Sequence, residues 1–420
     1  MSVLITAAKI LDPGSNHHGK SKNVLIEKGK ITYIGNDTPK SKTLIHGKGC
    51  YLSTGWCDMQ ANFNDPGFEH KEDLTSGSAA AEAGGYTDVA LLPNTLPIID
   101  SKNSVKYVQR NNGRQIVNCH PIAAATVKTQ GEEITEMLDL NEAGAIAFSD
   151  GNNTLWNTGV MLKSLQYVQK FDGLVIDRPE DKWLSMFGMM NEGVNSALLG
   201  LKGVPALAEE VVVARNLELL EYAGGRLHLS NISTEKSVKM IKAAKKAGLN
   251  VTADVAAIQL AFDDSTIQEF DANYKVNPPL RTQKDIKALI KGLEDGTIDA
   301  IVSAHEPHDE ECKKLEFDLA DFGVTSLQTV LPTLVQLNTT LSWEDLILKV
   351  TSNPRAILKL NQPKIEEGEV ANLTLFDTNY VWDFDQSTNQ SKSNNSPFYG
   401  SQLKGKVKAV FNNGMYSSFE

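Results

Sequence analysis

The regular alternation of strand-like and helical segments between residues 54 and 361 constrains the fold of this chain most strongly. Between the strand-like runs lie amphipathic stretches such as 234–247, where Val238, Ile241 and Ala244 recur at helical spacing. Ser233 or Thr234 can cap this helix. Alternation of this kind indicates a parallel sheet, and its length suits a (β/α)₈ barrel. The apolar strand-like runs are 87–93, 145–149, 174–177, 226–230, 250–254 and 300–303. We therefore predict an α/β fold with a TIM-type (β/α)₈ barrel over residues 54–361.

Both ends of the chain carry strand-like segments without helices between them. At the start these are 3–6, 23–27 and 30–35, and at the end they are 371–377 and 404–414. The Ser-, Asn- and Gln-rich segment 387–396 is typical of a surface loop.

Composition excludes several classes of protein. The chain is 41% hydrophobic and 22% charged, as in ordinary globular proteins, and its net charge of −11 argues against a nucleic-acid partner. We expect no association with a membrane, because no apolar run approaches 18 residues. The start has no secretion signal, so the cytoplasm is the expected location. The four cysteines are scattered, which predicts reduced core thiols.

Five short motifs occur in a characteristic order. The first, at 58–67, reads Asp-Met-Gln-Ala-Asn-Phe-Asn-Asp-Pro-Gly. The others are Pro-Asn-Thr-Leu-Pro at 93–97, Met-Asn-Glu-Gly at 190–193 with the segment 200–210, Lys-Val-Asn-Pro-Pro-Leu-Arg at 275–281, and Ala-His-Glu-Pro-His at 304–308. Over nearly its whole length the chain thus resembles the dihydroorotases, which belong to the amidohydrolase superfamily of metal-dependent ring hydrolases. The resemblance implies a barrel with a small β-sandwich built from both termini, residues 1–53 and 362–420.

The metal-binding pattern of the resembled family is largely missing. That family would use zinc, held by four His and two Asp residues, whereas the matching positions here are Gln60, Asn62, Arg178, Asn231, Ala304 and the retained Asp150. Neutral amides are weak ligands, alanine offers none, and a guanidinium repels a cation. Five of six positions are therefore lost, and we predict that the barrel mouth binds no metal cofactor. We also predict that Arg178 partly replaces the metal by pairing with Asp150 and with Gln60 or Asn62.

The resemblance also assigns vestigial substrate-binding positions to Asn64, Asn94, Asn277 and His308. Asn64 stands where the family has an arginine that grips the substrate carboxylate. Asn94 and Asn277 also suit a role in turn geometry. His305 and His308 are expected to be structural, as is His228 on a predicted strand. Lys275, Arg281 and Glu180 are expected to hold loops.

Two classes of function follow from this pattern. The first is a non-catalytic dihydroorotase-like protein of pyrimidine biosynthesis, because inactive homologues in the resembled family associate with aspartate carbamoyltransferase. An oligomer is expected in that case. The alternative is an active dihydroorotase or another cyclic amidohydrolase with an atypical site. A weaker option is a small-molecule sensor that uses the emptied barrel mouth. Metal analysis separates the hydrolase from the others, and a pull-down separates the scaffold from the sensor.

Overall fold

The larger part of the molecule is a parallel α/β barrel. The computed structural model describes residues 2–419, apart from the side chain of Gln268. Barrel strands lie side by side in chain order: β6 (Trp56–Ala61), β7 (Tyr86–Leu91), β8 (Asn118–Ala123), β9 (Ala147–Phe148), β10 (Val175–Asp177), β13 (Leu227–Leu229), β14 (Val251–Ala256) and β15 (Ala300–Val302). The last strand returns to the first, because the Asn62 amide donates to the His305 carbonyl at 2.8 Å. The predicted barrel is confirmed, although the strand-like runs read from the sequence missed β6 and β8.

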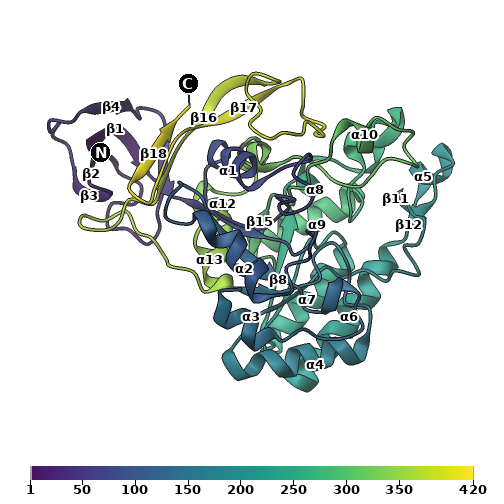
Figure 1. The fold of residues 1–420 in the computed structure, drawn as a ribbon. Helices are drawn as coiled ribbons and strands as arrows, with labels where there is room; N and C mark the ends of the chain where they lie inside the picture. Colours follow the sequence, from purple (N-terminus) through teal and green to yellow (C-terminus); the bar gives the residue numbers. More distant parts are fainter. Residues whose placement is uncertain (1, 420) are drawn as a thin grey trace.

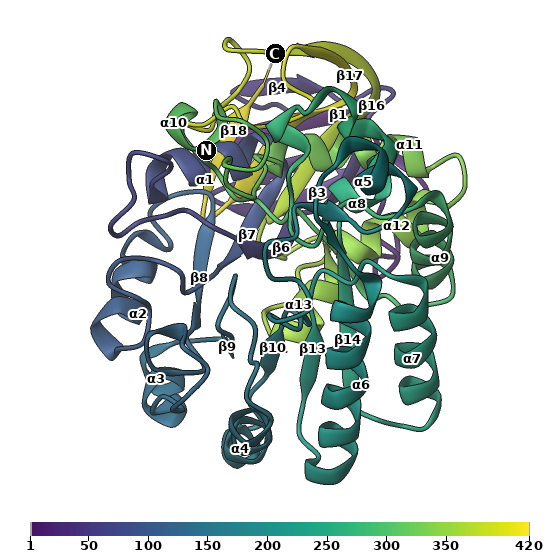
Figure 2. The ribbon, with the colours of Figure 1, turned by 90° about the vertical axis from the view of Figure 1, so that its right-hand side faces the viewer.

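Helices cover the outside of the barrel (Figure 2). In α7, Thr234 caps the first turn, while Val238, Ile241 and Ala244 are buried, as predicted. The longer helices are α1 (Leu74–Ala83), α2 (Lys102–Val108), α3 (Met137–Ala143), α4 (Thr158–Val168), α6 (Ala206–Ala223), α7 (Glu235–Lys246), α9 (Gln283–Glu294), α11 (Val330–Leu337), α12 (Trp343–Val350) and α13 (Ser352–Leu358). The short ones are α5 (Val194–Leu199), α8 (Ile258–Ala261) and α10 (Glu310–Lys313).

Strands from both chain ends join in one sheet beside the barrel (Figure 1). The join is antiparallel, with Leu375 opposite Leu52. In spatial order this sheet contains β18 (Met415–Ser418), β17 (Ser401–Asn412), β16 (Leu373–Phe384), β5 (Tyr51–Thr54), β1 (Ser2–Ile10), β2 (Ser21–Glu27) and β3 (Lys30–Gly35), with β4 (Thr43–His46) paired to β1. The expected joining of the two termini is confirmed. Gly55 separates β5 in this sheet from β6 in the barrel.

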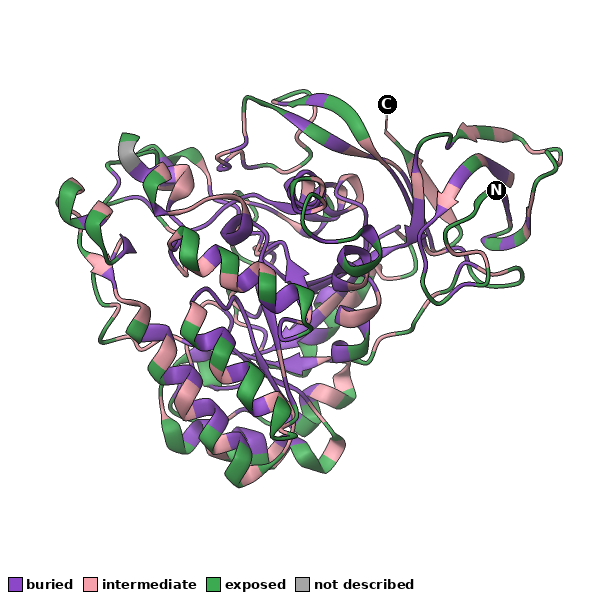
Figure 3. Ribbon diagram, turned by 180° about the vertical axis from the view of Figure 1, so that it is seen from behind, coloured by how far each residue is buried: buried purple, intermediate pink, exposed green. Residues whose placement is uncertain are grey.

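The burial of the residues follows this arrangement of strands and helices. The barrel strands are almost wholly buried, whereas the helices alternate buried and exposed faces (Figure 3). All four cysteines are free, and Cys50, Cys57 and Cys119 are buried as predicted, whereas the prediction of a core thiol is wrong for Cys312, which is only partly buried. Within the described residues 2–419, no helix is long and apolar enough to cross a membrane.

The loop 385–400, which connects β16 to β17, is less exposed than the sequence predicts. Ser393, Asn395 and Ser396 are buried. The Ser393 hydroxyl donates to the Lys71 carbonyl at 2.7 Å, and the Asn395 amide donates to the Glu306 and Gly323 carbonyls, both at 3.1 Å. The prediction of a surface loop is therefore wrong for the part of the loop that contains Ser393, Asn395 and Ser396. Its polar side chains satisfy carbonyls of the barrel rim rather than water, and composition does not distinguish these two partners.

Candidate functional site at the barrel mouth

The carboxyl ends of the barrel strands bring the replaced ligand positions together. Gln60 and Asn62 lie at the end of β6, Arg178 directly follows β10, Asn231 follows β13, and Ala304 follows β15. All five line one cavity of about 20 Å³. A buried water needs roughly 10–15 Å³, so this space holds one or two water molecules. The mouth is thus filled largely by the protein's own side chains.

Arg178 points into this mouth but does not pair with Asp150. Its guanidinium lies 3.4 Å from the Glu180 carboxylate, and it donates to the backbone carbonyls of Asn152 and Asn277. Among the interactions of the described chain there is none between Arg178 and Asp150. Arg178 thus brings positive charge to the mouth as expected, but the predicted pairing with Asp150 is wrong, and the recorded bonds of Arg178 within residues 2–419 do not include Gln60 or Asn62. Glu180, two residues along the chain, reaches the guanidinium more directly than the deeply buried Asp150.

Asp150 lies behind the mouth rather than on its lining. It is 1% exposed, and its carboxylate accepts hydrogen bonds from the backbone amide and the hydroxyl of Thr126, at 2.8 and 2.5 Å. Burial raises the pKa of Asp150 to about 6, although the hydrogen bonds from Thr126 act in the opposite direction and lower it. The retained carboxyl group therefore has hydroxyl and amide partners instead of a cation.

The positions assigned to substrate binding are spread around the mouth. Asn94 holds the turn after β9, since it donates to the Asp150 carbonyl at 3.1 Å and accepts from the Asn152 amide at 2.8 Å. Asn277 lines the cavity and donates to Glu180 at 2.9 Å. Asn64 has a φ of 57° and donates to the Pro307 carbonyl. Each of these amides thus has a structural partner.

Three polar residues that line the cavity, Asn152, Gln259 and Glu306, are not among the site residues predicted from the sequence. Glu306 accepts a hydrogen bond from Asn152 at 2.6 Å, and Gln259 donates to the Pro278 carbonyl at 2.6 Å. Burial raises the pKa of Glu306, although the positive charges of Arg178 and Lys313 oppose this effect. A signal for Glu306 was present: the motif at 304–308 has Ala at its first position and Glu at its third, where the family has Asp and Ala. The motif therefore keeps a carboxylate in a different place.

Several polar atoms at the mouth lack partners within the described part of the chain. They are Gln60 Oε1, Asn231 Oδ1, Gln259 Oε1 and Arg178 Nε. Buried polar groups are normally hydrogen-bonded, so such atoms indicate space for an ordered water.

The donor set does not fit the zinc that the resembled family would use. Zinc is bound by thiolate, imidazole and carboxylate groups, whereas amides and a guanidinium dominate this mouth. The imidazole of His305 is buried elsewhere: its Nδ1 accepts from the Ser326 amide at 3.1 Å, and its Nε2 lies 3.5 Å from Glu72. His228 is bonded to Thr252 and Asp254, both at 2.8 Å. The structural roles expected for His228 and for the loop-holding Lys275 and Arg281 agree with their buried hydrogen bonds.

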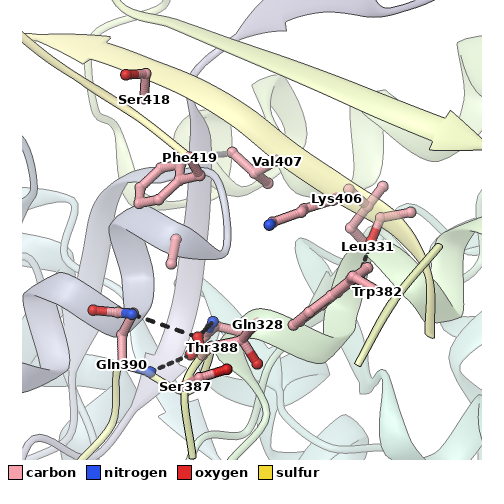
Figure 4. Close-up of a pocket in the computed structure, with 12 residues that line it drawn as sticks. Gln328, Leu331, Trp382, Ser387, Thr388, Gln390, Lys406, Val407, Ser418 and Phe419 are labelled. Atoms are coloured by element: carbon pink, nitrogen blue, oxygen red, sulfur yellow. Dashed lines mark hydrogen bonds between the residues drawn. The ribbon is translucent and has the colours of Figure 1, made fainter. Parts of the chain in front are cut away.

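A second cavity lies away from these residues, between the terminal sheet and the barrel (Figure 4). It measures about 320 Å³ and is lined by Trp382, Val407 and Gln328 among others. Gln328 bonds the loop 385–400 through Thr388 and Gln390 at 2.9 and 2.8 Å. None of the sequence-predicted site residues lines this cavity.

Comparison with known proteins shows similarity to dihydroorotases over nearly the whole chain. A dihydro-orotase-like family model matches residues 49–237, and an amidohydrolase family model matches residues 201–415. The chain is 38% identical to a dihydroorotase of Syntrophus aciditrophicus over 97% of both chains. It is 39% identical to a dihydroorotase of Acetivibrio thermocellus over 98% of both chains. Among solved structures, an L-hydantoinase from Arthrobacter aurescens matches with a TM-score of 0.86 at 21% identity, over 99% of this chain and 96% of that one. This structural likeness shows the fold alone.

Proposed function

Because the chain belongs to the dihydroorotase family of amidohydrolases, we propose that it is a family member that has lost hydrolase activity and serves pyrimidine biosynthesis as a structural or regulatory protein. The observation that carries this proposal is the composition of the barrel mouth. Five positions that the family uses for metal and proton transfer hold Gln60, Asn62, Arg178, Asn231 and Ala304, and the remaining cavity is about 20 Å³.

Ring hydrolysis in this family requires groups that the mouth lacks. A metal supplies a hydroxide near neutral pH and polarises the amide carbonyl, and a carboxylate carries the proton to the leaving nitrogen. The donors around Arg178 do not form a zinc site, and the methyl side chain of Ala304 has no group that can accept or donate a proton. Ala304 has a φ of 51°, a conformation in which Asn and Asp are enriched. The backbone at position 304 therefore still suits the Asp that the family pattern has there.

The proposed partner is aspartate carbamoyltransferase in the cytoplasm, as part of an oligomeric assembly. This partnership is supported by the resemblance to the family and by the retention of the family fold without the family's metal ligands. Co-expression followed by size-exclusion chromatography at micromolar concentration is expected to give one co-eluting peak. Separate elution of the two proteins over a range of salt concentrations would contradict the partnership without restoring a catalytic role.

One observation favours the alternative of an atypical cyclic amidohydrolase. Glu306 is a carboxyl group with a raised pKa at the cavity, beside Arg178 and several amides. A protonated carboxyl can act as a general acid, and a guanidinium can stabilise a developing negative charge. This reading requires that side chains of the mouth move apart, because the present cavity cannot admit a ring. An assay of Glu306→Gln distinguishes the two, since only a hydrolase of this kind loses turnover through that change.

A further inference from the structure

Three potential metal ligands meet on the barrel rim, outside the mouth cavity. They are His308, Cys312 and Asp321, each of which offers one ligand atom within 4.8 Å of the other two. His308 is buried, Cys312 is partly buried in α10, and Asp321 is exposed on the loop that follows. None of the three lines the cavity at Gln60 and Arg178.

The spacing of these atoms is close to that of a tetrahedral zinc site. Zinc bonds of about 2.0–2.3 Å place neighbouring ligand atoms roughly 3.3–3.8 Å apart. His308 Nδ1 and Asp321 Oδ2 are already 3.5 Å apart. Cys312 Sγ lies within 4.8 Å of a ligand atom of His308 and of one of Asp321, so the three side chains are close enough to share one ion.

A cation already occupies this position. The Lys71 ammonium lies 3.0 Å from His308 Nδ1 and 3.8 Å from Asp321 Oδ2. An ammonium donates hydrogen bonds only, so His308 Nδ1 must present its lone pair to Lys71. The imidazole and the carboxylate therefore both direct electron pairs toward one point that holds positive charge.

We propose that His308, Cys312 and Asp321 form a binding site for a zinc-class divalent ion, and that Lys71 competes with the ion for this site. On binding, the ion takes the Nδ1 lone pair, an Asp321 oxygen and the Cys312 sulfur, and the thiol proton is released to solvent. The set of one imidazole, one thiolate and one carboxylate matches zinc and cobalt(II) rather than magnesium or calcium. The exposed side of the site leaves the fourth position to water. Lys71 can withdraw toward Asp309, whose carboxylate lies near enough to feel its charge.

Cobalt(II) titration of the full chain tests this proposal, because cobalt bound to thiolate gives an intense near-ultraviolet charge-transfer band. We expect this band in the wild-type protein and its loss in Cys312→Ser. Removal of the competing charge in Lys71→Met should tighten binding at least about tenfold. Lys71→Arg, which keeps the charge, should not tighten it. Asp318→Asn, on the same loop but outside the cluster, is the matched control and should leave binding unchanged.

Circular dichroism and thermal melting establish that each variant is folded before it is titrated. Absence of the thiolate band in both wild type and Lys71→Met would overturn the proposal. A band that persists in Cys312→Ser would overturn it as well, because the sulfur ligand would then lie elsewhere.

Discussion

Two buried aspartates, at opposite ends of the barrel, have opposite electrostatic surroundings. Asp88, toward the amino ends of the strands, contacts the Arg355 guanidinium and His120 Nε2, each at 2.8 Å. Despite burial, the charge of the Arg355 guanidinium and the hydrogen bond with His120 hold the pKa of Asp88 well below its usual range. Asp150, at the carboxyl ends, is bonded to Thr126, and burial raises its pKa to about 6.

The difference separates a buried aspartate that has a protein countercharge from one that lies at a position where the family pattern has a metal ligand. A buried charge is tolerated when the protein supplies its countercharge, as Arg355 does for Asp88. A metal would neutralise Asp150 in the family pattern, whereas in residues 2–419 the recorded partner of Asp150 is Thr126, and Arg178 pairs with Glu180. A buried carboxylate without a cation partner carries an energetic cost at neutral pH.

The largest effect is expected where the countercharge is needed. Arg355 is 2% exposed, and Asp88→Asn leaves its guanidinium without a carboxylate partner. Removal of one partner of a buried pair costs about 3–5 kcal/mol of unfolding free energy. Urea denaturation at pH 7 measures this loss. The matched control is Asp172→Asn, whose ion pair with Lys359 is exposed and should contribute almost nothing. Equal effects of the two substitutions would remove the distinction between the ends of the barrel.

Asp150→Asn should have the opposite sign. The folded-state pKa of about 6 exceeds the ordinary value of 3.8, so the wild type loses stability as pH rises through this interval. At pH 7.5 the variant should be more stable than wild type by roughly 1–3 kcal/mol, and at pH 4 this advantage should disappear. Denaturation curves of both proteins across pH 4–8 measure this difference in unfolding free energy. A variant that is less stable than wild type at pH 7.5 would mean that Asp150 has a stabilising cation partner after all.

The smallest effect is expected at Arg178, which is partly accessible. Arg178→Met removes a positive charge that opposes the raised pKa of Glu306, so ionisation of Glu306 should become harder. We expect a loss of about 1 kcal/mol at alkaline pH that shrinks as the pH falls and Glu306 takes up its proton. Arg178→Lys, which retains the charge, should behave like wild type. A pH-independent loss in both variants would point to packing rather than charge.

Most of the architecture could be predicted from periodicity, because backbone geometry fixes the spacing at which buried side chains recur along helices and strands. Thr234 and the apolar positions of α7 lie where the pattern placed them. The partner of Arg178 could not be predicted, since two carboxylates compete for it and their reach depends on loop geometry. Asn395 lies in a segment whose polar composition is that of a surface loop, yet its side chain is buried against carbonyls of the rim. Glu306 could not be assigned to the cavity from the sequence, because a glutamate in a loop is ordinarily exposed and only the folded rim buries it.

The central claim is that the barrel mouth no longer catalyses ring hydrolysis. The direct test is the interconversion of dihydroorotate and carbamoyl aspartate, with added zinc, by protein purified from a host without its own dihydroorotase. Gln60→His should rescue nothing, because the ligands act as a unit. We predict no turnover above background for wild type or for this variant. Turnover of about 1 s⁻¹ or more by the wild-type protein, in the ordinary enzymatic range, would contradict the claim.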